Sequence, residues 1–200
     1  MIYLNIAVED ALSEVVLMQL VERFGDKYSI KNVFSRSGFG YLKSSIRGFN
    51  QASQFTPFLM LTDLDNYDCP LDLIGDWINF DQNNNLIFRI AVREVESWLL
   101  ADARGLADFF RISKAKFPLD PESLSDPKNT LIHLARKSRI RKIQEDIIPV
   151  NETAAIGPNY NGCLSEFVFN QWNIDNALKH SRSLNKAYRH LSEFEPTVIF

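Results

Sequence analysis

Cysteine is scarce in this 200-residue sequence: only Cys69 and Cys163 are present, and no CxxC motif occurs. This excludes a disulfide framework and a cysteine-based zinc ribbon. No apolar run approaches the roughly 18 residues that a membrane helix needs. The first ten residues, MIYLNIAVED, also lack the basic start of a signal peptide. We therefore expect a reduced, cytoplasmic protein with no membrane partner.

A strong excess of one charge is also missing, since 22 Lys and Arg face 25 Asp and Glu. The net charge of −3 argues against a protein that binds polyanions over its whole surface. The distribution is uneven: residues 1–127 carry 12 basic and 18 acidic side chains, and residues 128–200 carry 10 and 7. A metal site in the first part and an anion-binding surface in the second would produce this split, and so would chance.

Strand and helix patterns alternate through the first half of the chain. Apolar segments predict strands at 2–8, 28–36, 57–63 and 83–92. Helical periodicity and capping signals predict helices at 11–25, 70–79 and 94–110, and a glycine-containing turn that enters a helix at 37–53. This alternation predicts an α/β fold with a doubly wound, mainly parallel sheet of about four strands flanked by helices.

Beyond residue 110 the pattern is mainly helical. Helices are predicted at 126–138, 139–149, 162–171 and 175–192. The break at 111–127 contains three prolines and is the best candidate junction. We expect an α/β core at 1–110 and a helical extension at 111–200 that packs on the core as one structural unit.

Acidic residues follow three of the predicted strands. They are Glu9 and Asp10 after the first strand, Asp63 and Asp65 after the third, and Glu94 and Glu96 after the fourth. In open α/β sheets, ligands bind outside the carboxyl ends of the strands. In extended backbone Asp63 and Asp65 would point to one side, about 6–7 Å apart at Cα, and a neighbouring strand about 5 Å away would bring Glu9 to them.

These acids predict a metal site. Oxygen ligands from Glu9, Asp63 and Asp65 suit Mg²⁺ or Mn²⁺. All three histidines fall in the later helical part, which disfavours zinc. The alternative is that each acid is a helix N-cap or a turn residue.

Glu94 and Glu96 leave two geometries open. They share a face if the strand continues through residue 96, and they diverge by about 200° if the helix begins at 94. A helix start there would also favour Glu94 through the helix dipole.

Basic residues gather in two segments. The run ARKSRIRK carries Arg136, Lys137, Arg139, Arg141 and Lys142. The glycine-containing segment SRSGFGYLKSSIR adds Arg36, Lys43 and Arg47. Both could contact phosphates without sequence specificity, and the alternatives are a solvated helix face and a plain turn.

Several motifs resemble those of a known bacterial protein family with a TOPRIM-like core. They include LTDLDNYDCPLDLIGDW, FRIAVREVESWLLAD and IGPNYN, and the likeness covers nearly the whole chain. More distantly, the chain resembles the TOPRIM fold of topoisomerases, primases and overcoming-lysogenisation-defect type nucleases. The resemblance implies a strand-1 glutamate, here Glu9, and a DxD motif, here Asp63 and Asp65, which bind Mg²⁺ for phosphodiester chemistry. Asp10 departs from the small residue that commonly follows that glutamate.

The hypothesis from the sequence is a Mg²⁺-dependent phosphoryl-transfer enzyme, and within that class a nuclease. Glu94 or Glu96 would bind a second ion or act as a base, and Arg93 would stabilise charge on the transferring phosphate. One rival is a phosphorylation receiver domain, although the serine or threonine and the fifth-strand lysine of a receiver are not evident. The other is a non-catalytic TOPRIM-like scaffold that binds a protein partner.

Overall fold

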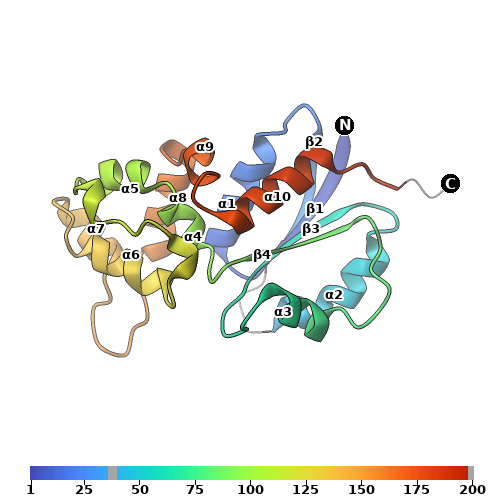
Figure 1. Cartoon of the computed structure of the whole chain (residues 1–200), viewed down its shortest axis with the longest axis horizontal. Coiled ribbons are helices and arrows are strands. Elements are labelled where there is room, and N and C mark those ends of the chain that lie inside the picture. Colours follow the sequence, from blue (N-terminus) through green and yellow to red (C-terminus); the bar gives the residue numbers. More distant parts are fainter. Residues whose placement is uncertain (36–39, 198–200) are drawn as a thin grey trace. The chain divides into compact units, whose positions relative to one another are not determined.

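The computed structural model describes residues 1–35 and 40–197 (Figure 1). The chain forms two compact units, one of Met1–Val92 with Lys186–Phe200 and the other of Arg93–Asn185. We call them the sheet unit and the helical unit. The junction predicted at 111–127 lies inside the helical unit, and the C-terminal segment returns to the sheet unit.

The sheet unit is built on four parallel strands. They are β1 (Ile2–Val8), β2 (Tyr28–Ser35), β3 (Phe58–Asp63) and β4 (Leu86–Ala91), in the order β2-β1-β3-β4. Ala7 of β1 lies opposite Met60 of β3, which lies opposite Phe88 of β4. The predicted α/β class with a four-stranded parallel sheet, followed by a mainly helical part, is confirmed. No fifth strand occurs within the described residues.

Helices cover both faces of this sheet (Figure 1). On one face lie α2 (Tyr41–Ala52) and α3 (Pro70–Trp77), whose apolar side chains form one cluster with the buried side chains Phe58, Met60, Phe88 and Ile90. The other face is covered by α1 (Ala11–Glu22) and by the part of α10 (Arg182–Glu193) from Lys186 onward. There the Tyr28 hydroxyl donates a hydrogen bond of 2.6 Å to the Leu191 carbonyl. Each fully buried large apolar side chain contributes about 1.5–3 kcal/mol to this core.

The helical unit contains short helices. They are α4 (Glu96–Leu100), α5 (Ala103–Phe110), η1 (Lys114–Lys116), η2 (Pro121–Ser123), α6 (Pro127–Ala135), α7 (Arg141–Ile147), α8 (Tyr160–Asn170) and α9 (Ile174–Ala177). No helix in the part of the chain that the structure describes is long and apolar enough to cross a membrane.

The single helix predicted at 94–110 is wrong, because Asp102 divides it into α4 and α5. Asp102 has a non-helical backbone, and its buried carboxylate accepts hydrogen bonds from the backbone N–H groups of Gly105 (3.1 Å) and Asn173 (2.8 Å). A Cβ at position 105 would lie 2.2 Å from an Asp102 carboxylate oxygen, so the cap requires glycine there. The apolar periodicity of this segment is continuous, but the helix is interrupted at Asp102 because its side chain caps the second helix.

Candidate metal centre

The carboxyl ends of all four strands lie along one edge of the sheet, because the strands are parallel. Glu9 follows β1, and the adjacent strand β3 places Thr62 beside it. The Thr62 hydroxyl donates a hydrogen bond of 2.7 Å to Glu9 Oε1. Glu9 therefore lies beside the end of β3, and Thr62 fixes the orientation of its carboxylate.

Glu9 lies in a region of negative charge. Its pKa is raised above its ordinary value, chiefly by burial. The hydrogen bond from Thr62 opposes this shift, whereas the negative charges of Asp65 and Asp10 reinforce it. Glu9, Asp65 and Asp10 are thus close enough to influence one another, and no cation contributes to the pKa of Glu9 within the described part of the chain.

The predicted extended geometry of Asp63 and Asp65 is wrong. The strand ends at Asp63, and Asp65 lies in a turn with a φ of 48°. Buried Leu64 donates its backbone N–H to the Ala91 carbonyl (2.9 Å), and Tyr67 closes the turn with a bond to the Leu64 carbonyl (3.1 Å). The left-handed backbone is one that aspartate tolerates better than most residues. The exposed Asp65 therefore reaches the neighbourhood of Glu9 from a turn and not from strand alternation.

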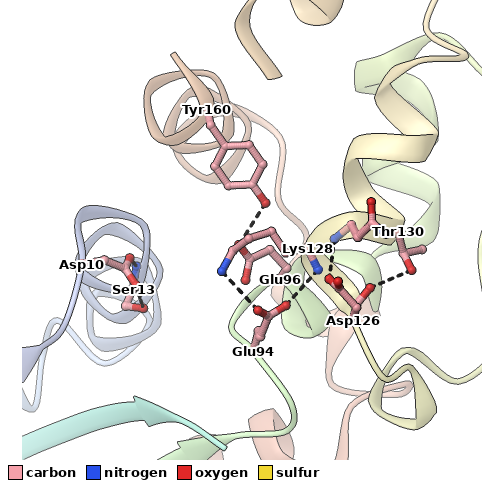
Figure 2. Close-up of polar contacts among 9 residues, drawn as sticks. Asp10, Ser13, Glu94, Glu96, Asp126, Lys128, Thr130 and Tyr160 are labelled. Carbon is pink, nitrogen blue, oxygen red and sulfur yellow. Dashed lines mark hydrogen bonds and ion pairs between the residues drawn. The ribbon is translucent and has the colours of Figure 1, made fainter. Parts of the chain in front are cut away.

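The alternative that acids here serve as helix caps is correct for Asp10. Its carboxylate accepts hydrogen bonds from the backbone N–H (2.8 Å) and the hydroxyl (3.2 Å) of Ser13 at the start of α1 (Figure 2). Asp10 adds negative charge near Glu9, but both of its oxygens are already used in the cap.

The donor atoms at this edge suit a hard cation. Within residues 1–35 and 40–197 the side chains form no group of three or more His, Cys, Asp or Glu that could hold a metal ion. Glu9 and Asp65 nevertheless provide two carboxylates, and Mg²⁺ typically uses one or two carboxylates with waters and substrate phosphates. The donor chemistry of these two residues is that of such an ion's ligands, and Asp63, which is half-buried at the strand end, stays a predicted ligand.

Glu94 belongs to the helical unit. The sequence left open a strand that continues through residue 96 or a helix that begins at 94, and neither occurs. The strand ends at Ala91 and α4 begins at Glu96, so Glu94 lies between them. Its carboxylate accepts hydrogen bonds from the backbone N–H (2.9 Å) and the Nζ (3.1 Å) of Lys128, at the start of α6 (Figure 2). These contacts use both oxygens of Glu94.

Glu96 is a buried carboxyl with a raised pKa. Its side chain is 2% exposed, and Oε1 accepts a hydrogen bond of 2.9 Å from the Tyr160 hydroxyl (Figure 2). Lys128 Nζ lies 3.7 Å from the same oxygen, while Oε2 is buried and accepts no hydrogen bond from the described residues. Burial raises the pKa of Glu96 to about 7, although Lys128 and Tyr160 lower it. A carboxyl in this range can exchange a proton near neutral pH.

The sequence analysis did not single out three residues that contact these glutamates: Thr62, Lys128 and Tyr160. Thr62 directly precedes the DxD motif, so pairing of β1 with β3 would have indicated its position beside Glu9. Lys128 follows the helix-starting proline in DPKN, and Tyr160 lies in IGPNYN. Nothing in the local sequence places Lys128 or Tyr160 next to Glu96, since they are 32 and 64 positions away along the chain.

Some cations predicted to contact nucleic acid have protein partners. Lys43 forms an ion pair of 2.5 Å with Asp76, and Arg47 donates a hydrogen bond to Asn79 (3.1 Å). Arg36 lies outside the described residues. Arg93 follows β4 in the sequence and is half-buried, and its predicted role stays a prediction.

In the second basic segment, ARKSRIRK, one cation has a protein partner and the others are exposed. Arg141 donates a hydrogen bond of 2.7 Å to Glu145 one turn later on α7. The remaining members are exposed; they are Arg136, Lys137, Arg139 and Lys142. Contact with nucleic acid stays a prediction for all of these residues.

Comparisons with known proteins give one structural likeness to report. No family model matches the sequence, and no curated protein matches it. The fold is similar to a solved structure of the C-terminal region of the Burkholderia pseudomallei OLD protein. The match has 18% sequence identity and a TM-score of 0.48, and it covers 94% of this chain and 98% of that one. We take no function from a likeness at this level.

Proposed function

We propose that this protein is a Mg²⁺-dependent phosphoryl-transfer enzyme, a nuclease that hydrolyses nucleic-acid phosphodiester bonds. The observation that carries the proposal is the environment of Glu9 at the carboxyl edge of the sheet. Its pKa is raised by burial and by the charges of Asp65 and Asp10. A divalent cation at Glu9 and Asp65 would offset this repulsion and would favour the ionised carboxylates.

The residues of this edge have distinct roles in the proposal. Glu9 and Asp65, with Asp63 as the further predicted ligand, would hold Mg²⁺ or Mn²⁺. The bound ion would neutralise charge on the phosphate oxygens and lower the pKa of a water nucleophile. Thr62 acts through Glu9, because its hydrogen bond to Oε1 holds that carboxylate in one orientation.

Of the two glutamates predicted as base or second-ion ligand, Glu96 is the better candidate for proton transfer. Its pKa of about 7 suits a group that accepts and releases a proton near neutral pH. Glu94 is already engaged twice by Lys128. Arg93 keeps its proposed role of stabilising charge on the transferring phosphate.

The test combines metal binding with cleavage. We expect Mn²⁺ to raise the melting temperature of the wild-type protein, because an ion that binds only the folded state stabilises it by roughly 1–3 kcal/mol at 10–100 times its dissociation constant. Glu9→Gln and Asp65→Asn should lose this response. The same variants should lose metal-dependent cleavage of single- or double-stranded DNA or RNA.

Asp26→Asn is the matched control for these variants. Asp26 is an exposed acid of the sheet unit that precedes β2, so it lies at the opposite edge of the parallel sheet. The control should keep both the Mn²⁺ response and cleavage. An equal Mn²⁺ response in wild type and Glu9→Gln would contradict the metal site.

The absence of a three-ligand group within the described residues favours a second candidate, the non-catalytic scaffold that binds a protein partner. A scaffold should fold equally well with and without divalent ions and cleave none of the four substrates. Metal-dependent cleavage that Asp65→Asn abolishes would exclude it.

A further inference from the structure

We propose that one corner of the helical unit binds the phosphate backbone of a nucleic-acid duplex. This inference rests on the proposed nuclease function and names the form of its substrate. We define this corner by η1 and by the turn between α6 and α7. Its cations, which we call the basic corner, are Lys114, Lys116, Arg136, Lys137 and Arg139.

The two segments of the basic corner meet through a buried hydrogen bond. Ser138, in the turn between α6 and α7, donates its hydroxyl to the carbonyl of Phe110 at the end of α5 (2.8 Å). The η1 turn begins four residues after Phe110. Arg111 and Ile140 also line one hollow of about 290 Å³. The segment that leads into η1 and the α6–α7 turn are thus neighbours in the helical unit, although they are more than 20 positions apart in the sequence.

The backbone of the α6–α7 turn is held in one conformation. The Gln144 side-chain amide donates to the carbonyls of Arg136 (3.3 Å) and Ser138 (2.8 Å), and the Ile140 N–H donates to the Ser138 hydroxyl (3.1 Å). Three basic residues are therefore presented from an ordered turn. A surface that is ordered before binding loses less conformational entropy when a ligand binds.

The charges of the basic corner are available to a ligand. All five side chains belong to exposed residues, and no ion pair joins them to a carboxylate within the described parts of the chain. Other cations nearby differ. Arg141 pairs with Glu145. Arg111 and Lys142 share their hollow with three acids, which are Asp108, Asp146 and Glu166. We therefore leave these three cations out of the binding set.

The chemistry of the basic corner favours a duplex over a single strand. Proteins that bind single strands combine cations with exposed aromatic rings on which bases stack. The segments 111–116 and 136–142 contain no aromatic residue, and the following Phe117 is buried. Cations alone contact phosphates and provide affinity without sequence specificity. The ligand class is therefore a duplex backbone, bound independently of its sequence.

The experiment measures binding of a 30-base-pair DNA duplex by fluorescence anisotropy in EDTA, so that the proposed metal site does not contribute. Five phosphate contacts predict a slope of about −4.5 for log K against log salt, and the variant K114Q/K116Q/R136Q/K137Q should retain a slope of about −1. At 100 mM salt we expect this variant to lose at least about 100-fold in affinity. A single strand of the same length should bind the wild type more weakly than the duplex.

The control K31Q/K179Q/R182Q/K186Q removes the same charge from exposed positions elsewhere and should keep the wild-type slope. If the fourfold variant fails to fold, K114Q/K116Q and R136Q/K137Q are measured separately, and each should lose about two units of slope. Equal losses in test and control variants, tighter binding of the single strand, or no binding by the wild type would each overturn the inference. None of these results bears on the Mn²⁺ response of Glu9→Gln, which tests the proposed function separately.

Discussion

The sheet unit and the helical unit each contain one glutamate with a raised pKa, Glu9 and Glu96, but the surroundings of the two carboxyl groups differ. In both cases burial is the main cause of the shift. Glu96 lies within 3.7 Å of the Lys128 ammonium group and accepts a hydrogen bond from Tyr160, so the protein itself provides its compensation. Among the described residues, the charged groups that act on Glu9 are Asp65 and Asp10, and both make its ionised form less favourable.

This difference indicates which kind of group can stabilise the ionised form of each carboxyl. A buried acid beside a lysine is a protein-internal arrangement that can exchange a proton. For an acid beside other acids, such as Glu9, our proposal is that a cation from solution stabilises the charged form. The predictions that follow change each glutamate, or one residue that acts on it, so that metal dependence and pH dependence can be assigned to different units.

The largest effect is expected from Glu9→Gln on metal-dependent cleavage. Losing a metal ligand should lower the rate roughly 1,000-fold, or ~4 kcal/mol in transition-state free energy. The decisive measurement compares the Mn²⁺-induced shift in melting temperature for Glu9→Gln and Glu96→Gln. Only Glu9→Gln should abolish the shift. Loss of the shift in Glu96→Gln would mean that the two carboxyls do not have separate roles.

The second effect concerns pH and stability. The folded state holds the Glu96 proton more tightly than the unfolded state, with a pKa of about 7 against 4.5, so this group lowers stability as pH rises through that window. The loss should reach about 3 kcal/mol above pH 7 and vanish below the unfolded pKa. Urea unfolding of wild type and Glu96→Gln between pH 4 and 8 measures the difference. Parallel curves for the two proteins would refute the assignment.

A smaller effect is expected from Lys128→Met. The variant removes the cation shared by Glu94 and Glu96, and we expect a loss of about 1–2 kcal/mol, because the partly exposed lysine is also screened by solvent. The loss should be larger at pH 8, where Glu96 is ionised, than at pH 5, where it is protonated. Urea unfolding at both pH values checks this. Lys179→Met, at an exposed position, is the control and should change stability little at either pH.

The smallest effect is expected at the cap of α1. Asp10→Ala should cost about 1 kcal/mol of unfolding free energy, whereas Asp10→Asn should cost only a few tenths, since asparagine caps helices nearly as well. Both changes remove a negative charge that raises the pKa of Glu9. Cleavage should therefore survive in Asp10→Asn. Its complete loss would identify Asp10 as a metal ligand and not a cap.

Much of the fold could be predicted from the sequence because the strands of the sheet are short apolar runs separated by helical periodicity. The same patterns failed where one side chain decided the local backbone. Asp102 divides a continuous periodic segment into α4 and α5, because its carboxylate caps the second helix. Asp65 adopts a left-handed conformation after β3, so the DxD motif does not lie along an extended strand.

Part of the candidate site could be predicted for a related reason. Parallel strands place their carboxyl ends at one edge of the sheet, so Glu9 and the DxD motif were expected at the same edge. The partners of Glu96 were not predicted, because Lys128 and Tyr160 come from helices far along the chain.

The sequence by itself determined the kinds of group available: a carboxylate-rich sheet edge without histidine, a helical second half and a run of cations. Local periodicity and side-chain chemistry suffice for these conclusions. Only the tertiary structure decided which groups meet, placing Thr62 on Glu9, Lys128 between two glutamates and Ser138 on the end of α5. The physical reason is that pKa values, ion pairs and shared surfaces depend on burial and on distances through space, which a linear pattern does not contain.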